Sequence, residues 1–399
     1  MTTANLEIED AVAFLAELVS TRSPNPPGDE RCVAEVIIRK AAALGLPEPK
    51  CHARNEQRPN LIFTLGHGAP NLMLAAHMDT VPAGNLASWT SDPFRLEAKG
   101  GRLAGLGSAD MKAAIAGMLF AAARIARNPE IVGTLTLVFS ADEENGSAYG
   151  MEWLAQHGLL VADAAAMTEP SGVGTRSWQR LYVAQRGHCV SWLVARGEPG
   201  HSGAHVAREK RASYAYVKAL NALLDSDPFA TWAHPVDGTK PTLNVATMVT
   251  GGMIPFAHPE TLKACIEVRV IEGMTKEMVL GRLRDVIAEA GLAERVTIEP
   301  ADPPIDWISP GQEARDERLL GAAKAAWRGV IGQEPVSAVL PGGTDSTHAN
   351  VAGIPALPAF GPGSLDVAHQ PNESLPAEDI RIAIDLYESF IRHYHRGAP

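Results

Sequence analysis

The strongest constraint on the fold is the alternation of short apolar runs with helical segments in the N-terminal part of the chain. Runs of strand length cover 60–66, 71–79 and 133–140, and the second is apolar through most of its span. Such runs are typical of strands buried on both faces of a sheet. Residues 111–127 read as an alanine-rich helix between two of them. We therefore predict an α/β fold with a mostly parallel sheet, flanking helices and a ligand crevice at the carboxyl edge of the strands.

A change of pattern near Leu181 predicts a second domain. Residues 181–197 alternate apolar and polar side chains, as a half-exposed antiparallel strand does. The order β, α, β, β, α, β is expected over 181–197, 213–224, 242–252, 261–273, 276–290 and 294–300. This order is typical of a ferredoxin-like α+β sandwich. We expect that domain at 182–305, inserted into an α/β domain made of 1–181 and 306–399.

Composition excludes several classes of protein. The 399 residues are 46% apolar and 20% charged, as in an ordinary globular protein of two or three domains. Lys and Arg number 35 and Asp and Glu number 46, so the formal charge is −11. An acidic surface repels phosphate backbones, so nucleic acid is not an expected partner.

The cysteines and the N-terminus predict a cytoplasmic protein. Cys32, Cys51, Cys189 and Cys265 lie far apart and form no Cys-x-x-Cys pair, so we expect no disulfide framework. The first twenty residues carry acids and no basic region, which favours an amphipathic helix over a signal peptide. The most apolar stretch, 113–123, is too short to span a bilayer.

Acidic and histidine side chains gather at the ends of the predicted buried strands and in glycine-rich turns. Asp and Glu are almost never fully buried unless they are paired or bind a metal. One metal ion needs three or four ligands, so this many candidates suggests two ions that share a bridging carboxylate. The candidates are His77, Asp79, Asp110, Asp142, Glu143, Glu144, Glu169 and His369.

Two spacings suggest a division of labour. In His77-x-Asp79 the intervening residue places both side chains on one face of an extended segment. In Glu143-Glu144 adjacent side chains point opposite ways, so one can face a metal and the other a water molecule as general base. Each residue taken alone is more often a cap or a surface residue. The hypothesis of a metal site therefore depends on the joint pattern.

An ordered set of motifs resembles a known enzyme family. The motifs include SPNPPGDE, AHMDTVPAGN, GLGSADMKAAIAGML, FSADEENGS, MTEP, VRVIEGMT, GGTDS and FGPGSLDVAHQPNE. Together they resemble the zinc-dependent family of acetylornithine deacetylases, succinyl-diaminopimelate desuccinylases, aminoacylases and glutamate carboxypeptidases. The resemblance covers essentially the whole chain. It implies a zinc exopeptidase-like catalytic domain with an inserted lid and dimerisation domain.

The resemblance implies two divalent metal ions. One zinc would be held by His77, Asp110 and Glu169, and Asp110 would bridge to a second zinc held by Glu144 and His369. Mixed histidine and carboxylate ligands favour zinc, with cobalt or manganese as alternatives. The resemblance makes Glu143 the general base, and then the acid that protonates the leaving amine. Asp79 would support His77 and the metal pair.

The resemblance extends to the inserted domain. His201 matches a lid histidine that polarises the scissile carbonyl, often from the partner subunit of a homodimer. Asn244 and Arg269 match residues that hold a substrate carboxylate, and Gly343 would line the substrate end of the site. The sequence departs from the family around His201, where it reads Gly-His-Ser-Gly-Ala-His. His205 is not expected to form a helical metal pair with His201, because the intervening glycine disfavours a helix.

We therefore predict a metal-dependent amidohydrolase that cleaves an N-acyl amino acid or a related small amide carrying a carboxylate. Hydroxide bridging the metals would attack the amide, with Glu143 as general base. Two alternatives stay open within enzymes: an exopeptidase of the glutamate carboxypeptidase or dipeptidase type, and an amidohydrolase for an unusual aromatic or xenobiotic amide. A metal-binding protein without catalysis is the remaining alternative. Glu143, Asp79 and His201 argue against it, because metal binding alone does not need them.

Overall fold

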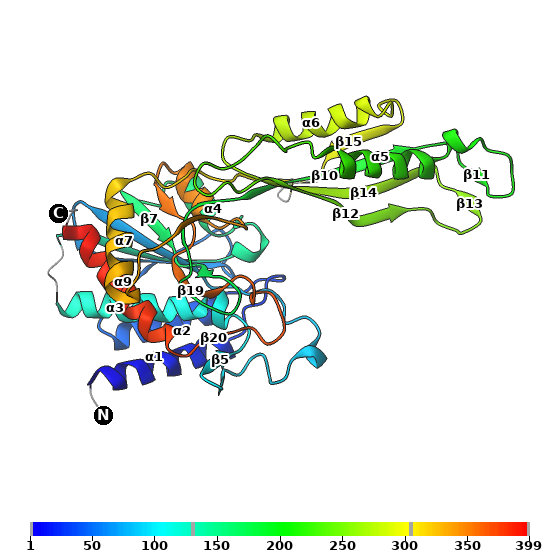
Figure 1. The fold of residues 1–399 in the computed structure, drawn as a ribbon. Coiled ribbons are helices and arrows are strands. Elements are labelled where there is room, and N and C mark those ends of the chain that lie inside the picture. Colours follow the sequence, from blue (N-terminus) through cyan, green and yellow to red (C-terminus); the bar gives the residue numbers. More distant parts are fainter. Residues whose placement is uncertain (1–2, 129–131, 303–305, 397–399) are drawn as a thin grey trace. The chain divides into compact units, whose positions relative to one another are not determined.

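A six-stranded sheet forms the centre of the first of two structural units in a computed structural model of the chain, which describes residues 3–128, 132–302 and 306–396. The first unit comprises Met1–Ala184, Gly311–Leu340 and Thr344–Pro399, and the second comprises Gln185–Pro310 and Pro341–Gly343 (Figure 1). Gly343 therefore belongs to the second unit, although it falls in the range 306–399 expected for the first domain. The boundary expected at 305 lies outside the described residues.

The central sheet is mixed. Its parallel strands are neighbours, and the acidic motifs follow them in the chain. Its order is β1-β2-β6-β3-β7-β18. The strands are β1 (Lys50–Ala53), β2 (Pro59–His67), β3 (Asn71–His77), β6 (Gly133–Ser140), β7 (Ala164–Met167) and β18 (Ala356–Leu357). β3 pairs in parallel with β6 and β7, and β18 is parallel to β7. β1 and β2 extend the sheet as antiparallel strands.

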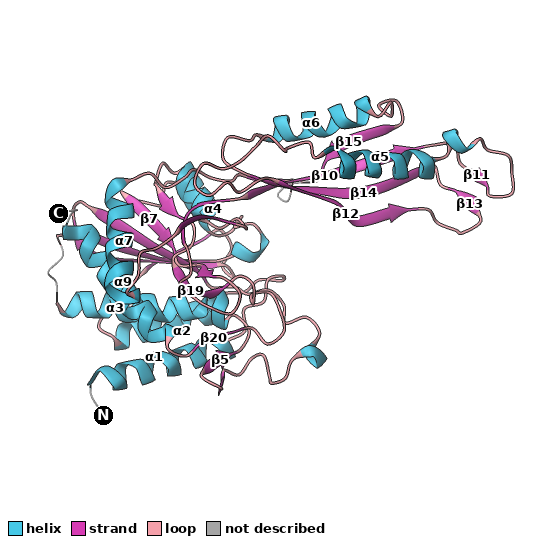
Figure 2. Ribbon diagram, in the orientation of Figure 1, coloured by secondary structure: helices cyan, strands magenta, loops and turns pink. Residues whose placement is uncertain are grey.

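Helices cover this sheet (Figure 2). They are α1 (Thr3–Ser20), α2 (Arg31–Ala43), α3 (Ala113–Arg127), α4 (Met151–Gln156), α7 (Glu317–Ile331), α8 (Ser346–Val351) and α9 (Asp379–Arg396). α1 and α7 pack mainly on other helices. α4 and α8 share a core with Met73 and Ala75 of β3, while α3 and α9 also contact that strand. β3 is accordingly buried along almost its whole length, as its apolar run predicts. Over the described residues, no helix has both the length and the apolar character that crossing a bilayer requires.

Several short elements connect these layers. The strands are β4 (Glu97–Lys99), β5 (Arg102–Ala104), β8 (Pro170–Gly172), β9 (Leu181–Gln185), β17 (Ser337–Leu340), β19 (Gly361–Ser364) and β20 (Ser374–Pro376). The helical turns are η1 (Leu86–Ser88), η2 (Ser108–Lys112) and η3 (Glu143–Asn145). The strand expected over 181–197 is interrupted at Arg186, because β9 pairs with β17 while the following strand joins the sheet of the second unit.

The second unit contains an antiparallel sheet with two helices. Its elements are β10 (Gly187–Arg196), β11 (Gly200–His201), η4 (Arg208–Lys210), α5 (Ala212–Ser226), β12 (Thr242–Gly251), β13 (Ala257–His258), β14 (Thr261–Val270), α6 (Lys276–Glu289), β15 (Val296–Pro300) and β16 (Trp307–Ile308). The main strands lie in the order β12-β14-β10-β15. The long elements follow one another as β, α, β, β, α, β, which is the order expected from the sequence.

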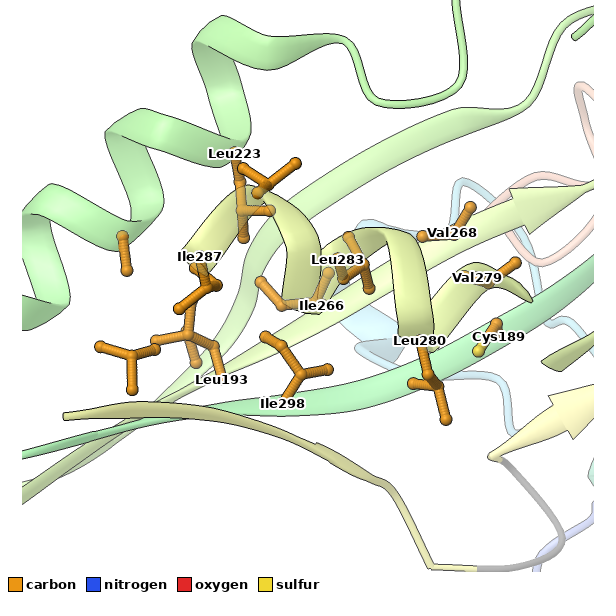
Figure 3. Packing of buried hydrophobic residues seen from close by; sticks show 14 of the residues in the cluster. Cys189, Leu193, Leu223, Ile266, Val268, Val279, Leu280, Leu283, Ile287 and Ile298 are labelled. Atoms are coloured by element: carbon orange, nitrogen blue, oxygen red, sulfur yellow. The ribbon is translucent and has the colours of Figure 1, made fainter. Parts of the chain in front are cut away.

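The core of the second unit lies between this sheet and its helices (Figure 3). Leu193 of β10 and Ile266 of β14 are buried against Leu223 of α5 and against Leu283 and Ile287 of α6. Alternate positions of β10 are fully buried in its first half, in agreement with the alternating pattern of its sequence. The second unit therefore has an apolar core of its own.

A close approach of two helices in the first unit gives a stability prediction. A Cβ atom at Gly117 of α3 would lie 2.9 Å from both Cβ of Ala383 and Cε2 of Tyr387 in α9. We expect Gly117→Ala to lower the free energy of unfolding by about 1–3 kcal/mol, because the packed helices must move apart. Gly321 of α7 has no atom within 4 Å of such a Cβ. Gly321→Ala is the matched control and should raise stability by about 0.5–1 kcal/mol. Equal gains for both variants in urea titrations would contradict the close packing.

Candidate metal centre

Five predicted ligands come together at the carboxyl edge of the central sheet. His77 is the last residue of β3, Glu169 follows β7, and Glu144 lies on η3 after β6. Because these strands are parallel neighbours, their carboxyl ends meet at one edge. Asp110 on η2 and His369 in the loop after β19 complete the cluster.

The ligands form two groups that share Asp110. In the first group, Nε2 of His77 lies 3.0 Å from Oδ1 of Asp110 and 3.7 Å from Oε1 of Glu169. In the second, Nε2 of His369 lies 3.3 Å from Oδ2 of Asp110 and 2.9 Å from Oε2 of Glu144. Within each group the ligand atoms lie within 4.8 Å of one another. Asp110 thus directs one carboxylate oxygen to each group, and imidazole with carboxylate donors suits zinc, cobalt or manganese.

The electrostatics of the cluster favour a bound cation. Burial raises the pKa of three carboxyls, those of Glu143, Glu144 and Glu169. Hydrogen bonds to the Asp110 and Glu144 carboxylates raise the pKa of His369 to about 11. So many buried acids cost free energy unless positive charge compensates them. A divalent cation supplies that charge and holds its ligands in their deprotonated forms.

Asp79 is fully buried behind His77 and makes contacts that its spacing did not predict. Its Oδ1 lies 3.5 Å from Nδ1 of His77, and its backbone oxygen lies 3.0 Å from the same nitrogen. In addition, Oδ1 accepts a hydrogen bond from the backbone N–H of Glu143 at 3.2 Å, and Oδ2 accepts one from that of Glu144 at 3.1 Å. Asp79 therefore supports the turn that carries both glutamates as well as the histidine.

Glu143 and Glu144 lie on one turn of 3₁₀ helix, and not on the extended backbone that their adjacent spacing assumed. The turn begins after Asp142, whose φ is 67°. Glu144 directs Oε2 to His369, while its Oε1 accepts the backbone N–H of Val81 at 3.1 Å. The Glu143 carboxyl lies outside both ligand groups among the described residues, and the charge of Glu169 adds to burial in raising its pKa. This arrangement leaves Glu143 available to exchange a proton.

Glu373 is a buried neighbour of Asp110 that the sequence analysis did not single out. It is fully buried and accepts backbone N–H groups from Gly107 at 2.9 Å, Ala109 at 2.7 Å and Asp110 at 3.0 Å. They hold the turn that precedes α3. Met111 has non-helical backbone angles, and the helix expected from residue 111 begins at Ala113. Burial raises the pKa of Glu373 to about 8. The sequence offered one indication of this residue, which is its place four positions after His369 in the same motif.

The remaining predicted residues belong to the second unit. His201 is exposed at the end of β11, where its Nδ1 accepts the backbone N–H of Gly203 at 3.1 Å. Asn244 of β12 and Arg269 of β14 both bind Glu267: the Nδ2 of Asn244 lies 3.0 Å from Oε2, and the Nε of Arg269 lies 2.7 Å from Oε1.

Gly343 also lies in the second unit, where a Cβ would approach the backbone oxygen of Arg186 to 3.3 Å. Arg186, a residue that the sequence analysis did not single out, donates through Nε to the oxygen of Pro341 at 3.2 Å. The structure therefore brings Gly343 close to the start of β10.

Comparison with known proteins identifies the family. The model of peptidase family M20/M25/M40 matches residues 73–393. The chain belongs to this family. A succinyl-diaminopimelate desuccinylase of Parvibaculum lavamentivorans is 30% identical over 404 residues, covering 97% of this chain and 96% of that protein. One from Thioalkalivibrio sulfidiphilus is 28% identical over 393 residues, covering 96% and 99%.

Solved structures of M20 proteins share the fold. An M20 metallo-carboxypeptidase from Sulfolobus solfataricus aligns with a TM-score of 0.75 at 18% identity, over 97% of this chain and 99% of that one. A Bacillus subtilis protein described as a dinuclear metal binding peptidase of the M20 family aligns with a TM-score of 0.68 at 16% identity, over 97% and 98%.

Membership of this M20 family settles the general activity. The chain is a metal-dependent hydrolase that acts on amide bonds. The resemblance found in the sequence motifs and the prediction of an amide-cleaving enzyme are both confirmed.

Proposed function

We propose that this hydrolase removes the acyl group of an N-acylated amino acid, in the manner of a deacetylase or desuccinylase. The observation that carries the proposal is the pair of ligand groups joined by Asp110, with the Glu143 carboxyl beside them. The relatives similar over almost the whole chain are named succinyl-diaminopimelate desuccinylases, which supports an acylated amino acid as substrate.

We assign His77, Asp110 and Glu169 to one divalent ion, and Asp110, Glu144 and His369 to a second, with zinc as the preferred metal. Bound there, the ions supply Lewis acidity for polarising the carbonyl and activating water. Glu143 takes the proton from the attacking water and delivers it to the leaving nitrogen, a role that suits a buried carboxyl with a raised pKa. The Asp79 carboxylate keeps Glu143 in place by accepting a hydrogen bond from the backbone N–H of Glu143.

We assign substrate binding to residues of the second unit, which would act as a lid. Arg269 and Asn244 would hold the substrate carboxylate, beside the backbone of Gly343. The guanidinium of Arg269 meets Glu267 through Nε, so its terminal nitrogens suit a second carboxylate. His201 would stabilise the developing oxyanion with its imidazole. We place the enzyme in the cytoplasm as a homodimer.

A complementation experiment tests whether His201 acts across that dimer. We expect His201→Ala and Glu143→Ala to be nearly inactive alone. When they are unfolded and refolded together, one site of each mixed dimer receives both intact residues if His201 comes from the partner. Random pairing of the two chains should then restore about one quarter of wild-type activity. Activity that stays at the level of the separate variants would show that His201 acts within its own chain or not at all.

A hydrolysis screen tests the choice of substrate. The zinc-loaded or cobalt-loaded enzyme is given N-acetyl, N-formyl and N-succinyl amino acids beside dipeptides and acyl-glutamates, and products are identified by mass spectrometry. We expect cleavage of the acyl amino acids. Preferential cleavage of dipeptides or acyl-glutamates would instead make the chain an exopeptidase. Silence on the whole panel would point to an unusual aromatic or xenobiotic amide, in line with the altered sequence around His201.

A further inference from the structure

A buried polar cluster lies behind Asp79 and takes no part in the chemistry described so far. Its members come from the segment SPNPPGDE, from the residue that precedes β2 and from the loop after β6. Each is at most 5% exposed. The members are Asn25, Glu30, Arg58 and Asp142.

Asn25 binds the carboxylates of Asp79 and Asp142, which follow two different strands, β3 and β6. Its Nδ2 donates to Oδ2 of Asp79 at 2.8 Å and to Oδ1 of Asp142 at 2.9 Å. Both amide hydrogens are thereby used. The backbone N–H of Asn25 is held in turn by the oxygen of Thr80 at 2.8 Å. Asn25 thus keeps two buried like charges together that would otherwise repel each other.

Arg58 supplies the positive charge of the cluster. Its Nη2 lies 2.9 Å from Oδ1 of Asp142, and its Nε lies 2.7 Å from Oε2 of Glu30. The guanidinium lies so close to Gly28 that a Cβ there would come within 2.1 Å of Nη1, and the φ of that glycine is 79°. Glycine is therefore required at this place in the motif. Loss of either partner of such a buried pair is strongly destabilising.

Asp142 and Asp79 between them determine where the Glu143 turn lies. Asp142 precedes the turn with a left-handed backbone, and its Oδ2 accepts the backbone N–H of Tyr149 at 3.1 Å. Asp79 accepts the backbone N–H groups of Glu143 and Glu144. One amide, that of Asn25, is hydrogen-bonded to both of these carboxylates.

We propose that Asn25, backed by Arg58, is a positioning residue for Glu143. By tying Asp79 to Asp142, it sets the height and direction of the turn from which the Glu143 carboxyl reaches the water and the leaving nitrogen. This inference rests on the proposed role of Glu143 as proton carrier. It also gives the SPNPPGDE segment a function in turnover that is separate from metal binding.

The test is a double-mutant cycle on kcat, with an N-succinyl amino acid as probe. Asn25→Ala should lower kcat about 10–100-fold, with KM and a content of two metals per chain little changed. In the background of Glu143→Asp, whose shorter side chain has already moved the carboxyl, the same change should cost much less than in the wild type. If Asn25 had a purely structural role, the fold-losses in kcat of the two single variants would multiply in the double variant. That result would overturn the proposal. Loss of metal from Asn25→Ala would overturn it as well.

Two further variants keep the experiment decisive. Asn71→Ala is the matched control, because this asparagine bonds Thr136 and the backbone of Val161 at the opposite end of β3. It should affect stability without coupling to Glu143. Asn25→Ser keeps one hydroxyl donor and should fall between the wild type and the alanine variant in kcat. If neither Asn25 variant folds, the cluster serves folding and the positioning role is wrong. Failure of the proposed function is distinguishable, since the wild type would then cleave no acyl amino acid.

Discussion

Glu143→Ala should lower turnover by about 10²–10⁴-fold while both metal ions stay bound, because Glu143 carries the proton in the proposed mechanism. The reason is its position: among the described residues it lies outside both ligand groups, but close enough to Glu169 for that charge to raise its pKa. The measurement is kcat on the best acyl substrate, together with metal content by mass spectrometry. Glu143→Gln, which keeps the shape and removes the carboxylate, should fall equally far.

Two outcomes would contradict this assignment. Near-normal turnover in Glu143→Ala would show that another group transfers the proton. Loss of one metal would show that Glu143 is a ligand. Glu152→Ala provides a control for the removal of an acidic side chain, because Glu152 lies on α4 and bonds Gln156 at the surface. It should change neither quantity.

Asp110→Ala is expected to empty both metal sites at once, and turnover should fall below detection. Asp110 gives Oδ1 to the group of His77 and Oδ2 to the group of His369, so its loss removes a ligand from each. Glu169→Ala and His369→Ala should each weaken one site only. Metal stoichiometry after dialysis against a weak chelator distinguishes the three variants, since removal of one ligand from a group of three costs much of its affinity.

The contrast between these variants makes the prediction strict. If Asp110→Ala retains one ion as firmly as Glu169→Ala does, Asp110 does not bridge and the two groups are independent. If all three variants lose both ions, the sites are cooperative and geometry alone does not separate them. Full restoration of activity by added zinc would count against Asp110 as a bridging ligand.

Much of the first unit could be predicted from residue pattern, and the exceptions have a common cause. The apolar runs at 71–79 and 133–140 correctly indicate buried strands, because a strand covered on both faces needs apolar side chains at successive positions. The strand expected at 60–66 is present as β2, but its antiparallel pairing and the further antiparallel strand β1 were not anticipated. Strand order depends on which distant segments pair, and no local pattern encodes that partner.

The start of the helix expected at 111–127 also differs from the local prediction. Its sequence favours a helix throughout, yet Asp110 and Met111 have non-helical backbone angles. Glu373 binds the backbone N–H groups of this turn from far along the chain. The turn before the helix is thus held by a contact between positions 110 and 373, which only the folded chain brings together.

Residue type and spacing indicated a metal site, whereas the amide-cleaving activity was predicted from the resemblance to the family. Histidine and carboxylate side chains after buried strands predict a metal site, since parallel strands bring their carboxyl ends to one edge whatever the loops do. Tertiary structure alone decided how the loops place those groups. In the folded chain, Asp79 accepts the backbone N–H of Glu143, and Asn25 donates to two carboxylates. The Glu267 carboxylate binds both Asn244 and Arg269. Except for the bond between Arg269 and Glu267, which lie two residues apart on β14, these bonds join residues far apart in the chain, and local sequence carries no record of that pairing.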